Sequence, residues 1–174
     1  MNNPVAAPAT ISLIGMPGVG KSTVGVILAK LLGRHFVDSD LDIQLREGDA
    51  LQTILDRDGY RRLREIEEEV LLALDLENAI VSTGGSAVYS DPVMARLRAA
   101  GPVVYLQADL ATLAPRVAAT PDRGVANDSS QSFADIYEER TPLYASQATH
   151  QVDATAGNAD QIALTIARLV SSPA

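Results

Sequence analysis

Residues 10–23 read TISLIGMPGVGKST, in which a short apolar run leads directly into the pattern G-x-x-x-x-G-K-[ST] between Gly15 and Ser22. Glycines allow the backbone to curl so that successive N–H groups point inward, where phosphate oxygens can accept their hydrogen bonds. The Lys21 ammonium can reach the β- and γ-phosphates of a nucleotide, and the Ser22 hydroxyl can bind magnesium. A helix beginning at this lysine would also present its positive N-terminal end to the phosphates. The stretch therefore predicts a phosphate-binding turn between a strand and a helix.

We expect this turn to bind ATP together with magnesium. The residues predicted to contact the nucleotide are Gly15, Gly18, Val19, Gly20, Lys21, Ser22 and Thr23. The alternative is a glycine-rich turn that binds nothing. However, the apolar strand before the turn and the helix after it are what the phosphate-binding mechanism requires.

Short apolar runs and longer helical patterns alternate along the rest of the chain. The runs predict strands at Thr10–Ile14, His35–Asp38, Ala79–Ser82, Val103–Leu106 and Gln151–Val152. Helices are predicted at Lys21–Leu32, Ala50–Arg57, Tyr60–Leu76, Pro92–Ala99, Leu110–Ala118, Ser132–Ala148 and Ala159–Leu169. This alternation is typical of βαβ units, so we expect an α/β fold with a mainly parallel sheet. Ligands of such sheets bind outside the carboxyl ends of the strands.

The composition limits the class of protein. With 174 residues, 47% of them apolar, the chain suits one domain over residues 1–174, and we expect a flexible start at residues 1–9. The net charge of −8 argues against a nucleic-acid partner. No apolar stretch approaches the ~20 residues that span a bilayer, and the N-terminus lacks the features of a signal peptide, so we expect a cytoplasmic protein with no membrane partner. The absence of cysteine excludes disulfides and thiolate metal sites.

Two carboxylates stand where the second predicted strand ends. Asp38 and Asp40 are two residues apart, so they can serve different partners. One can reach magnesium, while the other holds an acceptor hydroxyl and helps to remove its proton. The alternative is that Asp-Ser-Asp only caps a helix, because Asp and Ser are both good caps.

Further candidates lie on later elements. Arg64 and Glu67 are three residues apart and so share a helix face. Gly84 and Gly85 follow the third predicted strand, where paired glycines allow the backbone to approach a ligand closely. Arg140 stands near the end of a predicted helix. Spacing alone would also permit surface charges and a tight turn at these positions.

The segment Thr120–Gln131 reads TPDRGVANDSSQ and is rich in Pro, Gly, Asn, Asp and Ser. Such a composition is typical of a loop and offers few apolar contacts to hold it down. We expect a lid that is mobile without ligands and ordered when both substrates are bound.

Together these motifs resemble the shikimate kinase family over nearly the whole chain, from Thr10 to Leu169. The segments that carry the resemblance are GMPGVGKST, FVDSD, LREIEEEV, TGG and YEERTPLY, which occur in that family's order and at compatible spacings. The first is shared by many kinases, whereas the other four are much more specific. The resemblance implies a nucleoside-monophosphate-kinase-like fold, with a five-stranded parallel sheet in the order 2-3-1-4-5 flanked by helices. It also implies transfer of the ATP γ-phosphate to the 3-hydroxyl of shikimate, on the route to chorismate and the aromatic amino acids, by what we expect to be a monomer.

For the nucleotide half of the site, the resemblance implies a role for each matching residue. Lys21 matches the lysine of the phosphate-binding turn, and Ser22 and Asp38 match the pair that holds magnesium. Arg116 resembles an arginine near the adenine. Arg123 resembles a lid arginine that reaches over the phosphates.

For the acceptor half, the resemblance implies the substrate-binding residues Asp40, Arg64, Glu67, Gly84, Gly85 and Arg140. Arg64 and Arg140 match arginines that bind the shikimate carboxylate, and Glu67 braces Arg64. The planar guanidinium suits this role because it makes paired hydrogen bonds to a carboxylate. Asp40 matches the carboxylate that binds the shikimate hydroxyls. The residues expected to act in the transfer itself are Lys21, Asp40 and Arg123.

The sequence departs from the family pattern at two places near the acceptor. Ser86 stands where the family usually has a third glycine, which serves either a positive φ or a close approach to the substrate. In the lid, the run from Arg123 to Ala126 lacks the usual proline and the larger apolar residues. Two alternatives therefore stay open: a related kinase of another hydroxy acid or polyol, and a nucleotide-binding homologue with little turnover.

Overall fold

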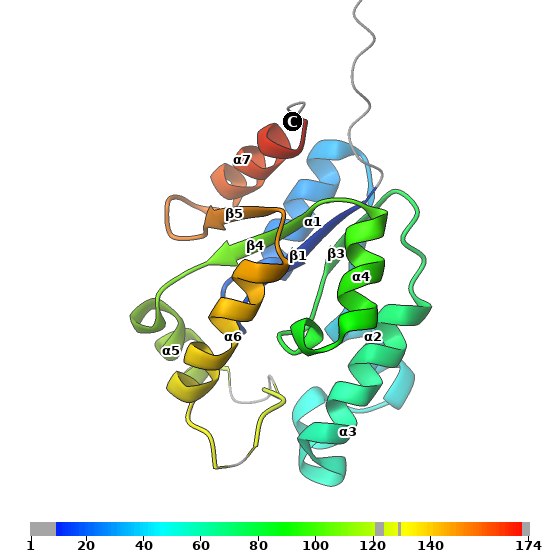
Figure 1. Ribbon diagram of the computed structural model, residues 1–174, viewed down its shortest axis with the longest axis vertical. Helices are drawn as coiled ribbons and strands as arrows, with labels where there is room; N and C mark the ends of the chain where they lie inside the picture. Colours follow the sequence, from blue (N-terminus) through cyan, green and yellow to red (C-terminus); the bar gives the residue numbers. More distant parts are fainter. Residues whose placement is uncertain (1–9, 121–123, 129, 172–174) are drawn as a thin grey trace, which may run out of the picture.

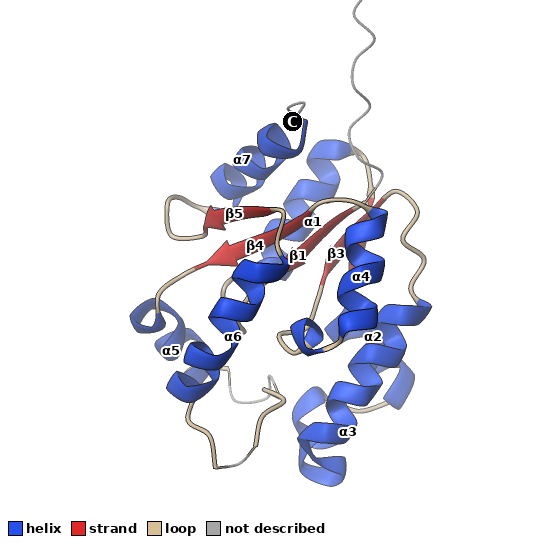
Figure 2. Cartoon of the chain, in the orientation of Figure 1, coloured by secondary structure: helices blue, strands red, loops and turns tan. Residues whose placement is uncertain are grey.

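The computed structural model describes residues 10–120, 124–128 and 130–171 (Figure 1). Its strands are β1 (Ile11–Ile14), β2 (His35–Asp38), β3 (Ala79–Ser82), β4 (Val103–Gln107) and β5 (His150–Asp153). They pair in parallel in the order β2-β3-β1-β4-β5 (Figure 2). This order confirms the predicted fold class. The expected flexible start at residues 1–9 lies outside the described residues.

Helices cover both faces of the sheet. They are α1 (Lys21–Leu32), α2 (Ser39–Glu47), α3 (Leu51–Ala73), α4 (Asp91–Ala100), α5 (Leu110–Ala118), α6 (Phe133–Gln147) and α7 (Ala159–Ser171), with a short 3-10 helix η1 (Ala87–Tyr89). In Figure 1, α1 and α7 lie behind the sheet, whereas α4 and α6 lie in front of it. The result is a three-layer αβα arrangement, in which every crossover between parallel strands is helical.

The three inner strands form the core. All residues of β1 and β3 are buried, and β4 is buried except at its last residue, whereas the edge strands β2 and β5 are only partly covered. Apolar runs that are buried on both faces are what a parallel sheet between two helical layers requires. A second, smaller core cluster lies between α2 and α3 and consists of Ile43, Leu51, Ile54, Leu63, Ile66, Val70 and Ala126.

The predicted strands agree with the structure to within one residue at each end. The two helices predicted at Ala50–Arg57 and Tyr60–Leu76 run together as α3, with a break at Gly59. Gly59 has φ 80° and ψ 166°, a conformation outside the helical region. The prediction of two helices is therefore confirmed, because α3 consists of two helical segments that meet at a kink at Gly59.

Helix α2 was missed by the sequence analysis, which left residues 41–49 without an assignment. Its apolar residues Leu41, Ile43 and Leu45 alternate with polar ones, a period that does not indicate a helix. Of these three side chains, Ile43 is buried, whereas Leu41 and Leu45 are 54% and 73% exposed. The helix instead depends on its ends: the Asp38 side chain accepts a hydrogen bond at the N-cap, and Gly48 closes the C-terminus with φ 71°.

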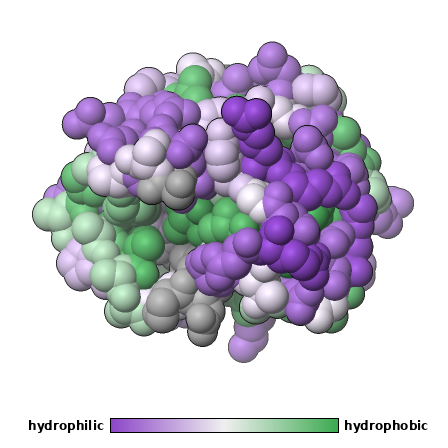
Figure 3. Space-filling view, turned by 90° about the horizontal axis from the view of Figure 1, so that it is seen from below, coloured by the Kyte–Doolittle hydropathy of each residue, from purple (hydrophilic) through white to green (hydrophobic). Residues whose placement is uncertain are grey.

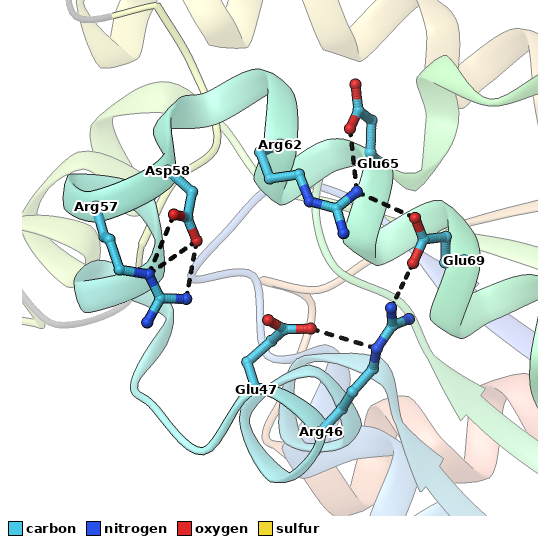
Figure 4. A network of polar contacts seen from close by, with 7 residues as sticks. All are labelled: Arg46, Glu47, Arg57, Asp58, Arg62, Glu65 and Glu69. Carbon is cyan, nitrogen blue, oxygen red and sulfur yellow. Dashed lines mark hydrogen bonds and ion pairs between the residues drawn. The ribbon is translucent and has the colours of Figure 1, made fainter.

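A network of ion pairs joins the outer surfaces of α2 and α3 (Figure 4). Arg46 pairs with Glu69 at 2.5 Å, and Arg62 pairs with Glu65 and with Glu69 at 3.1 Å each. These side chains are exposed, so each pair contributes at most about 1 kcal/mol. None of these side chains lines the pockets that hold the site residues described below, so the network connects the two helices and is separate from the site.

Within the described ranges, no helix is both long enough and apolar enough to cross a membrane.

The core around β1 generates a stability prediction. Leu13→Ala should lower the free energy of unfolding by about 2–5 kcal/mol, because Leu13 is fully buried and its loss leaves a cavity. The matched control, Leu45→Ala, should change it by no more than about 0.5 kcal/mol, since that side chain is 73% exposed. Urea unfolding followed by circular dichroism measures both. Equal losses would mean that the described core is wrong.

Candidate active site

The predicted site residues gather at the carboxyl ends of β1, β2 and β3. The cavity that we call the acceptor pocket lies there and is lined by Pro17, Lys21, Ser22, Asp40, Ile43, Leu51, Leu63, Glu67, Thr83, Gly84, Gly85, Ser86, Gly124, Val125, Ala126 and Arg140. Figure 3 shows the molecule from below the view of Figure 1, with apolar surface in the middle of this face and hydrophilic residues gathered beside it. The lining residues come from six segments of the chain: the turn into α1, α2, α3, the turn after β3, the loop after α5, and α6.

The phosphate-binding turn connects β1 to α1 as predicted. Gly15 has φ 145°, and a Cβ at this position would lie 2.6 Å from the carbonyl oxygen of Leu106. Gly20, directly before the helix, has φ 102°. Residues with side chains rarely adopt either conformation, so the two outer glycines of the motif are required by the shape of the turn.

Lys21 lies over this turn in the first turn of α1. Its Nζ donates to the carbonyl oxygens of Gly15 and Met16, at 2.8 and 3.1 Å, and the residue is only 8% exposed. The Lys21 ammonium thus lies beside the N–H groups of the first turn of α1. The positive charge and the N–H donors both favour binding of an anion there. This arrangement suits the phosphates of a nucleotide.

Oxygen ligands for magnesium lie next to the turn. Ser22, Asp38 and Asp40 line one open depression, and Ser22 Oγ lies 3.4 Å from Ser82 Oγ. Among the described residues, no group of three or more His, Cys, Asp or Glu side chains could hold a metal by itself. One hydroxyl and one or two carboxylates still fit magnesium, which keeps several waters and takes its remaining ligands from phosphates. Asp38 also accepts a hydrogen bond from the Asp40 N–H at 3.1 Å, so the capping alternative for Asp38 is compatible with the metal role.

Two arginines converge on one carbonyl oxygen at the other end of the pocket. Arg140 Nη2 donates to the Ala126 carbonyl oxygen at 2.6 Å, and Arg64 donates to the same oxygen through Nε and Nη2 at 3.3 and 3.2 Å. Arg140 is 1% exposed. We call these two residues the arginine pair. An oxygen held by two guanidinium groups occupies the kind of position that a carboxylate oxygen prefers.

Tyr89 separates and orders the arginine pair. The Arg64 guanidinium lies 4.0 Å from the Tyr89 ring centroid, and Arg140 Nε donates to the Tyr89 hydroxyl at 3.2 Å. That hydroxyl in turn donates to Glu139 at 2.5 Å. Ring face and hydroxyl thus hold one arginine each, which limits the directions in which the guanidinium groups can point.

Glu67 lies on α3 and is 4% exposed. Burial raises the pKa of its carboxyl group to about 7, and the nearby Asp40 carboxylate acts in the same direction. The hydrogen bond that Ser86 Oγ donates to Glu67 Oε2 opposes this rise, as do the positive charges of Arg140 and Lys21.

The expected contact between Glu67 and Arg64 is absent from the described residues, where Glu67 bonds to Ser86 and Arg64 to the Ala126 carbonyl. Because Arg64 also lies against two tyrosine rings, its position here depends on the loop and on Tyr60 and Tyr89. The bracing role of Glu67 stays a prediction.

The loop after α5 is anchored more firmly than its composition suggested. Ala126 is 6% exposed and belongs to the core cluster between α2 and α3, and Val125 packs against the main core. Gly124 has φ 62°, and a Cβ there would lie 2.6 Å from the backbone carbon of Leu51. Small residues therefore let this backbone lie against the start of α3, although the sequence analysis took their size as a loss of anchors.

With the loop in this position the acceptor pocket encloses about 40 Å³. That is room for a few water molecules, since a cavity needs about 10–15 Å³ to hold one. A substituted six-membered ring needs more room than this.

The remaining predicted residues have the following places. Val19 is buried in the turn, and Ser22 and Thr23 are exposed at the start of α1. Arg116 is exposed on α5, with Nη1 3.4 Å from the Gly18 carbonyl oxygen, so it flanks the phosphate-binding turn. Arg123 lies outside the described residues.

Three contributors to the site were missed in the sequence. Ser39 is fully buried and its Oγ accepts a hydrogen bond from the Gly84 N–H at 2.8 Å, which ties the start of α2 to the glycine turn. Tyr89 and the Ala126 carbonyl oxygen were also missed. Ser39 lies within the Asp-Ser-Asp motif, so the sequence offered a signal for it. Tyr89 is an isolated tyrosine and the Ala126 contribution is a backbone carbonyl, and neither has a signal in the local sequence.

Comparison with known proteins identifies the family. The family model described as shikimate kinase matches residues 17–171. The chain belongs to the shikimate kinase family. Among curated members, it is 39% identical to the shikimate kinase of Mycobacterium avium (strain 104) over 155 residues, 87% of each chain. It is 33% identical to shikimate kinase 2 of Enterobacter sp. (strain 638) over 150 residues, 83% of this chain and 86% of the relative.

Solved structures of shikimate kinases have the same fold. The shikimate kinase from Acinetobacter baumannii in complex with shikimate superposes with a TM-score of 0.86 at 32% identity, covering 93% of this chain and 92% of the other. The enzyme from Aquifex aeolicus gives a TM-score of 0.78 at 28% identity, with coverages of 93% and 95%. Membership of the shikimate kinase family thus rests on sequence and fold alike.

The docked loop generates a prediction with a matched control. Gly124→Ala should displace the loop, because the new Cβ collides with the Leu51 backbone in addition to the cost of a positive φ, about 1–2 kcal/mol. Gly48→Ala carries the same conformational cost at φ 71° but has open space around the Cβ. Methyl NMR should lose the contacts between the Ala126 methyl and Leu63 or Ile54 only in Gly124→Ala. Contacts that persist in this variant would contradict the described docking.

Proposed function

We propose that this chain transfers the γ-phosphate of ATP to the 3-hydroxyl of shikimate, giving shikimate 3-phosphate on the route to chorismate and the aromatic amino acids. One observation carries the proposal: a single pocket has Arg140 at one end and Lys21 with the phosphate-binding turn at the other. Arg64, which does not line this pocket, donates to the same Ala126 carbonyl oxygen as Arg140, so the two guanidinium groups mark a position suited to a carboxylate oxygen. Shikimate has one carboxylate and three hydroxyls, which matches a pocket with fixed cations at one end and oxygen acceptors at the other.

The carboxylate of the acceptor would replace the Ala126 carbonyl oxygen on the arginine pair. Its charge makes it the better partner, because a hydrogen bond with an ionised acceptor is roughly twice as strong as one with a neutral acceptor. The guanidinium groups are already oriented by Tyr89, so little reorganisation is needed. Binding of the acid would release residues 124–128 and open the room that the ring requires.

Asp40 is the proposed partner of the reacting hydroxyl. It lines both the acceptor pocket and the depression that holds Ser22 and Asp38. A carboxylate at this junction can accept a hydrogen bond from the hydroxyl and help to draw off its proton as the phosphate is transferred.

Phosphate transfer itself depends mostly on position and on neutralised charge. Lys21 and the N-terminus of α1 supply the fixed positive field, and magnesium, proposed to lie on Ser22 and Asp38, would offset charge on the β- and γ-phosphates. Arg116 near the adenine and Arg123 over the phosphates stay predictions. The lid at Thr120–Gln131, the monomeric state and the cytoplasmic location stay predictions as well.

A coupled ADP-release assay with and without shikimate tests the proposal directly. ADP release that depends on shikimate, with a phosphorylated product seen by mass spectrometry, would support it. Transfer to another hydroxy acid or polyol but not to shikimate would favour a related kinase, and ATP binding without transfer would favour the low-turnover homologue.

Lys21→Ala should abolish transfer while the fold stays intact. Losing one preorganised electrostatic contact to the transition state costs on the order of 10²-fold or more in kcat. Lys30→Ala is the control, because this lysine lies exposed in the last turn of the same helix. Wild-type turnover by a folded Lys21→Ala protein would remove Lys21 from the mechanism.

Arg64→Ala and Arg140→Ala should each raise the KM for shikimate much more than the KM for ATP. Each removes a charge-assisted hydrogen bond, on the order of 1.5–3 kcal/mol or 10- to 150-fold. Arg98→Ala, an exposed arginine on α4, is the control. Equal losses for both substrates would instead indicate structural damage.

A further inference from the structure

Ser86 has an ordinary backbone conformation, although the shikimate kinase family usually has a third glycine at this position. Its φ is −98° and its ψ −1°, within the region that any residue adopts. The turn thus needs no glycine here for its conformation. Ser86 is 6% exposed, so its hydroxyl is buried beside the acceptor pocket and has to find a partner there.

That partner is Glu67 on α3. Ser86 Oγ donates to Glu67 Oε2, while Glu67 Oε1 is buried and accepts no hydrogen bond from the described residues. A buried carboxylate oxygen without a donor is unusual, because nearly all such atoms are paired. Since Glu67 lines the acceptor pocket, the missing donor is expected to come from a ligand.

The free oxygen of Glu67 faces the same space as Asp40. A Cβ placed on Gly84 would lie 2.7 Å from Asp40 Oδ1 and closer still to Glu67 Oε1. Two carboxyl oxygens on two helices therefore converge over the backbone of Gly84. Neighbouring hydroxyl groups on one ring have the chemistry that such a pair of acceptors binds.

We propose that Ser86 is a positioning residue, whose hydroxyl holds Glu67 Oε2 so that Oε1 is directed at a second hydroxyl of the acceptor, beside the one bound by Asp40. This inference rests on the proposed function and assigns a role to the residue that departs from the family pattern. The serine is then an adaptation within the same reaction and gives no sign of another acceptor.

The charge of Glu67 supports this role. Burial and the Asp40 carboxylate raise the pKa of Glu67 to about 7. The hydrogen bond from Ser86 and the positive charges of Arg140 and Lys21 act in the opposite direction and lower it. The other neighbour with a titratable group, Tyr144, donates its hydroxyl hydrogen to the Gly85 carbonyl oxygen. Removal of the Ser86 hydroxyl should raise the pKa of Glu67 further, because a donor to the ionised form is lost. Glu67 would then be protonated at neutral pH.

Kinetics of three variants test the proposal. Ser86→Ala should raise the KM for shikimate about tenfold, the size expected for one hydrogen bond to a charged group, and leave the KM for ATP unchanged. The acidic limb of its kcat/KM profile for shikimate should move to higher pH. Ser86→Thr keeps the hydroxyl and should behave like the wild type. Ser12→Ala, which alters a fully buried serine on β1 whose hydroxyl has no partner in the described structure, should change neither property.

A titration that needs no turnover separates this inference from the proposed function. The side-chain carboxyl carbons of glutamate are labelled with ¹³C, and Glu67→Gln assigns the Glu67 signal. Ser86→Ala should raise the titration midpoint by about one pH unit, since a hydrogen bond to a charged group is worth about one pKa unit.

An unchanged midpoint together with an unchanged KM for shikimate would overturn the role of Ser86. A gain of activity on shikimate in Ser86→Ala would do the same, because the serine would then exclude this substrate. If shikimate is not phosphorylated by the wild type but the midpoint still rises in the variant, the positioning of Glu67 stands and the proposed function fails.

Discussion

A guanidinium group buried at the carboxyl end of the sheet is the constraint on which the acceptor half of this protein depends. Arg140 is 1% exposed and its guanidinium carries only hydrogen-bond donors, so these N–H groups must have acceptors. The Tyr89 hydroxyl and the Ala126 carbonyl oxygen provide two of them. Meeting this requirement brings η1 and residues 124–128 to the same side of α6. The pocket that results holds the Ala126 carbonyl oxygen at the position where we propose that the substrate carboxylate binds.

The two halves of the site differ in how they are built. The nucleotide half is local, because one strand, one glycine-rich turn and the first turn of one helix supply the phosphate-binding groups. The acceptor half draws its groups from α2, α3, the turn after β3, the loop after α5 and α6. A change in α3, in the turn after β3 or in α6 can therefore alter the acceptor pocket while the turn between β1 and α1 keeps its own groups. The departures from the family pattern at Ser86 and Gly124 both fall in this second half.

Two carboxyl groups of like charge, the partly exposed Asp40 and the buried Glu67, set the electrostatics of the pocket. Their proximity makes it harder for both to be ionised at once, and burial adds to the effect on Glu67. Lys21 and Arg140 offset part of this cost from opposite ends of the pocket, and Ser86 offsets part of it through a hydrogen bond. The site therefore holds Glu67 close to the point where a small change in its surroundings decides its charge.

The sequence by itself determined the sheet and the phosphate-binding turn, and it named the charged residues that we propose for the site. Apolar runs predict buried strands, and glycines mark unusual backbone conformations. Both signals come from residues that are adjacent in the sequence, so they can be seen without the fold. Tertiary structure alone decided that Ser86 bonds to Glu67, that Ala126 occupies the arginine pair and that Tyr89 orders it. The helix at residues 39–47 is an intermediate case, because the alternation of Leu41, Ile43 and Leu45 does not have a helical period, whereas its cap residues Asp38 and Gly48 stand in the sequence. The contacts of Ser86, Ala126 and Tyr89 depend on partners that come together only once the chain has folded.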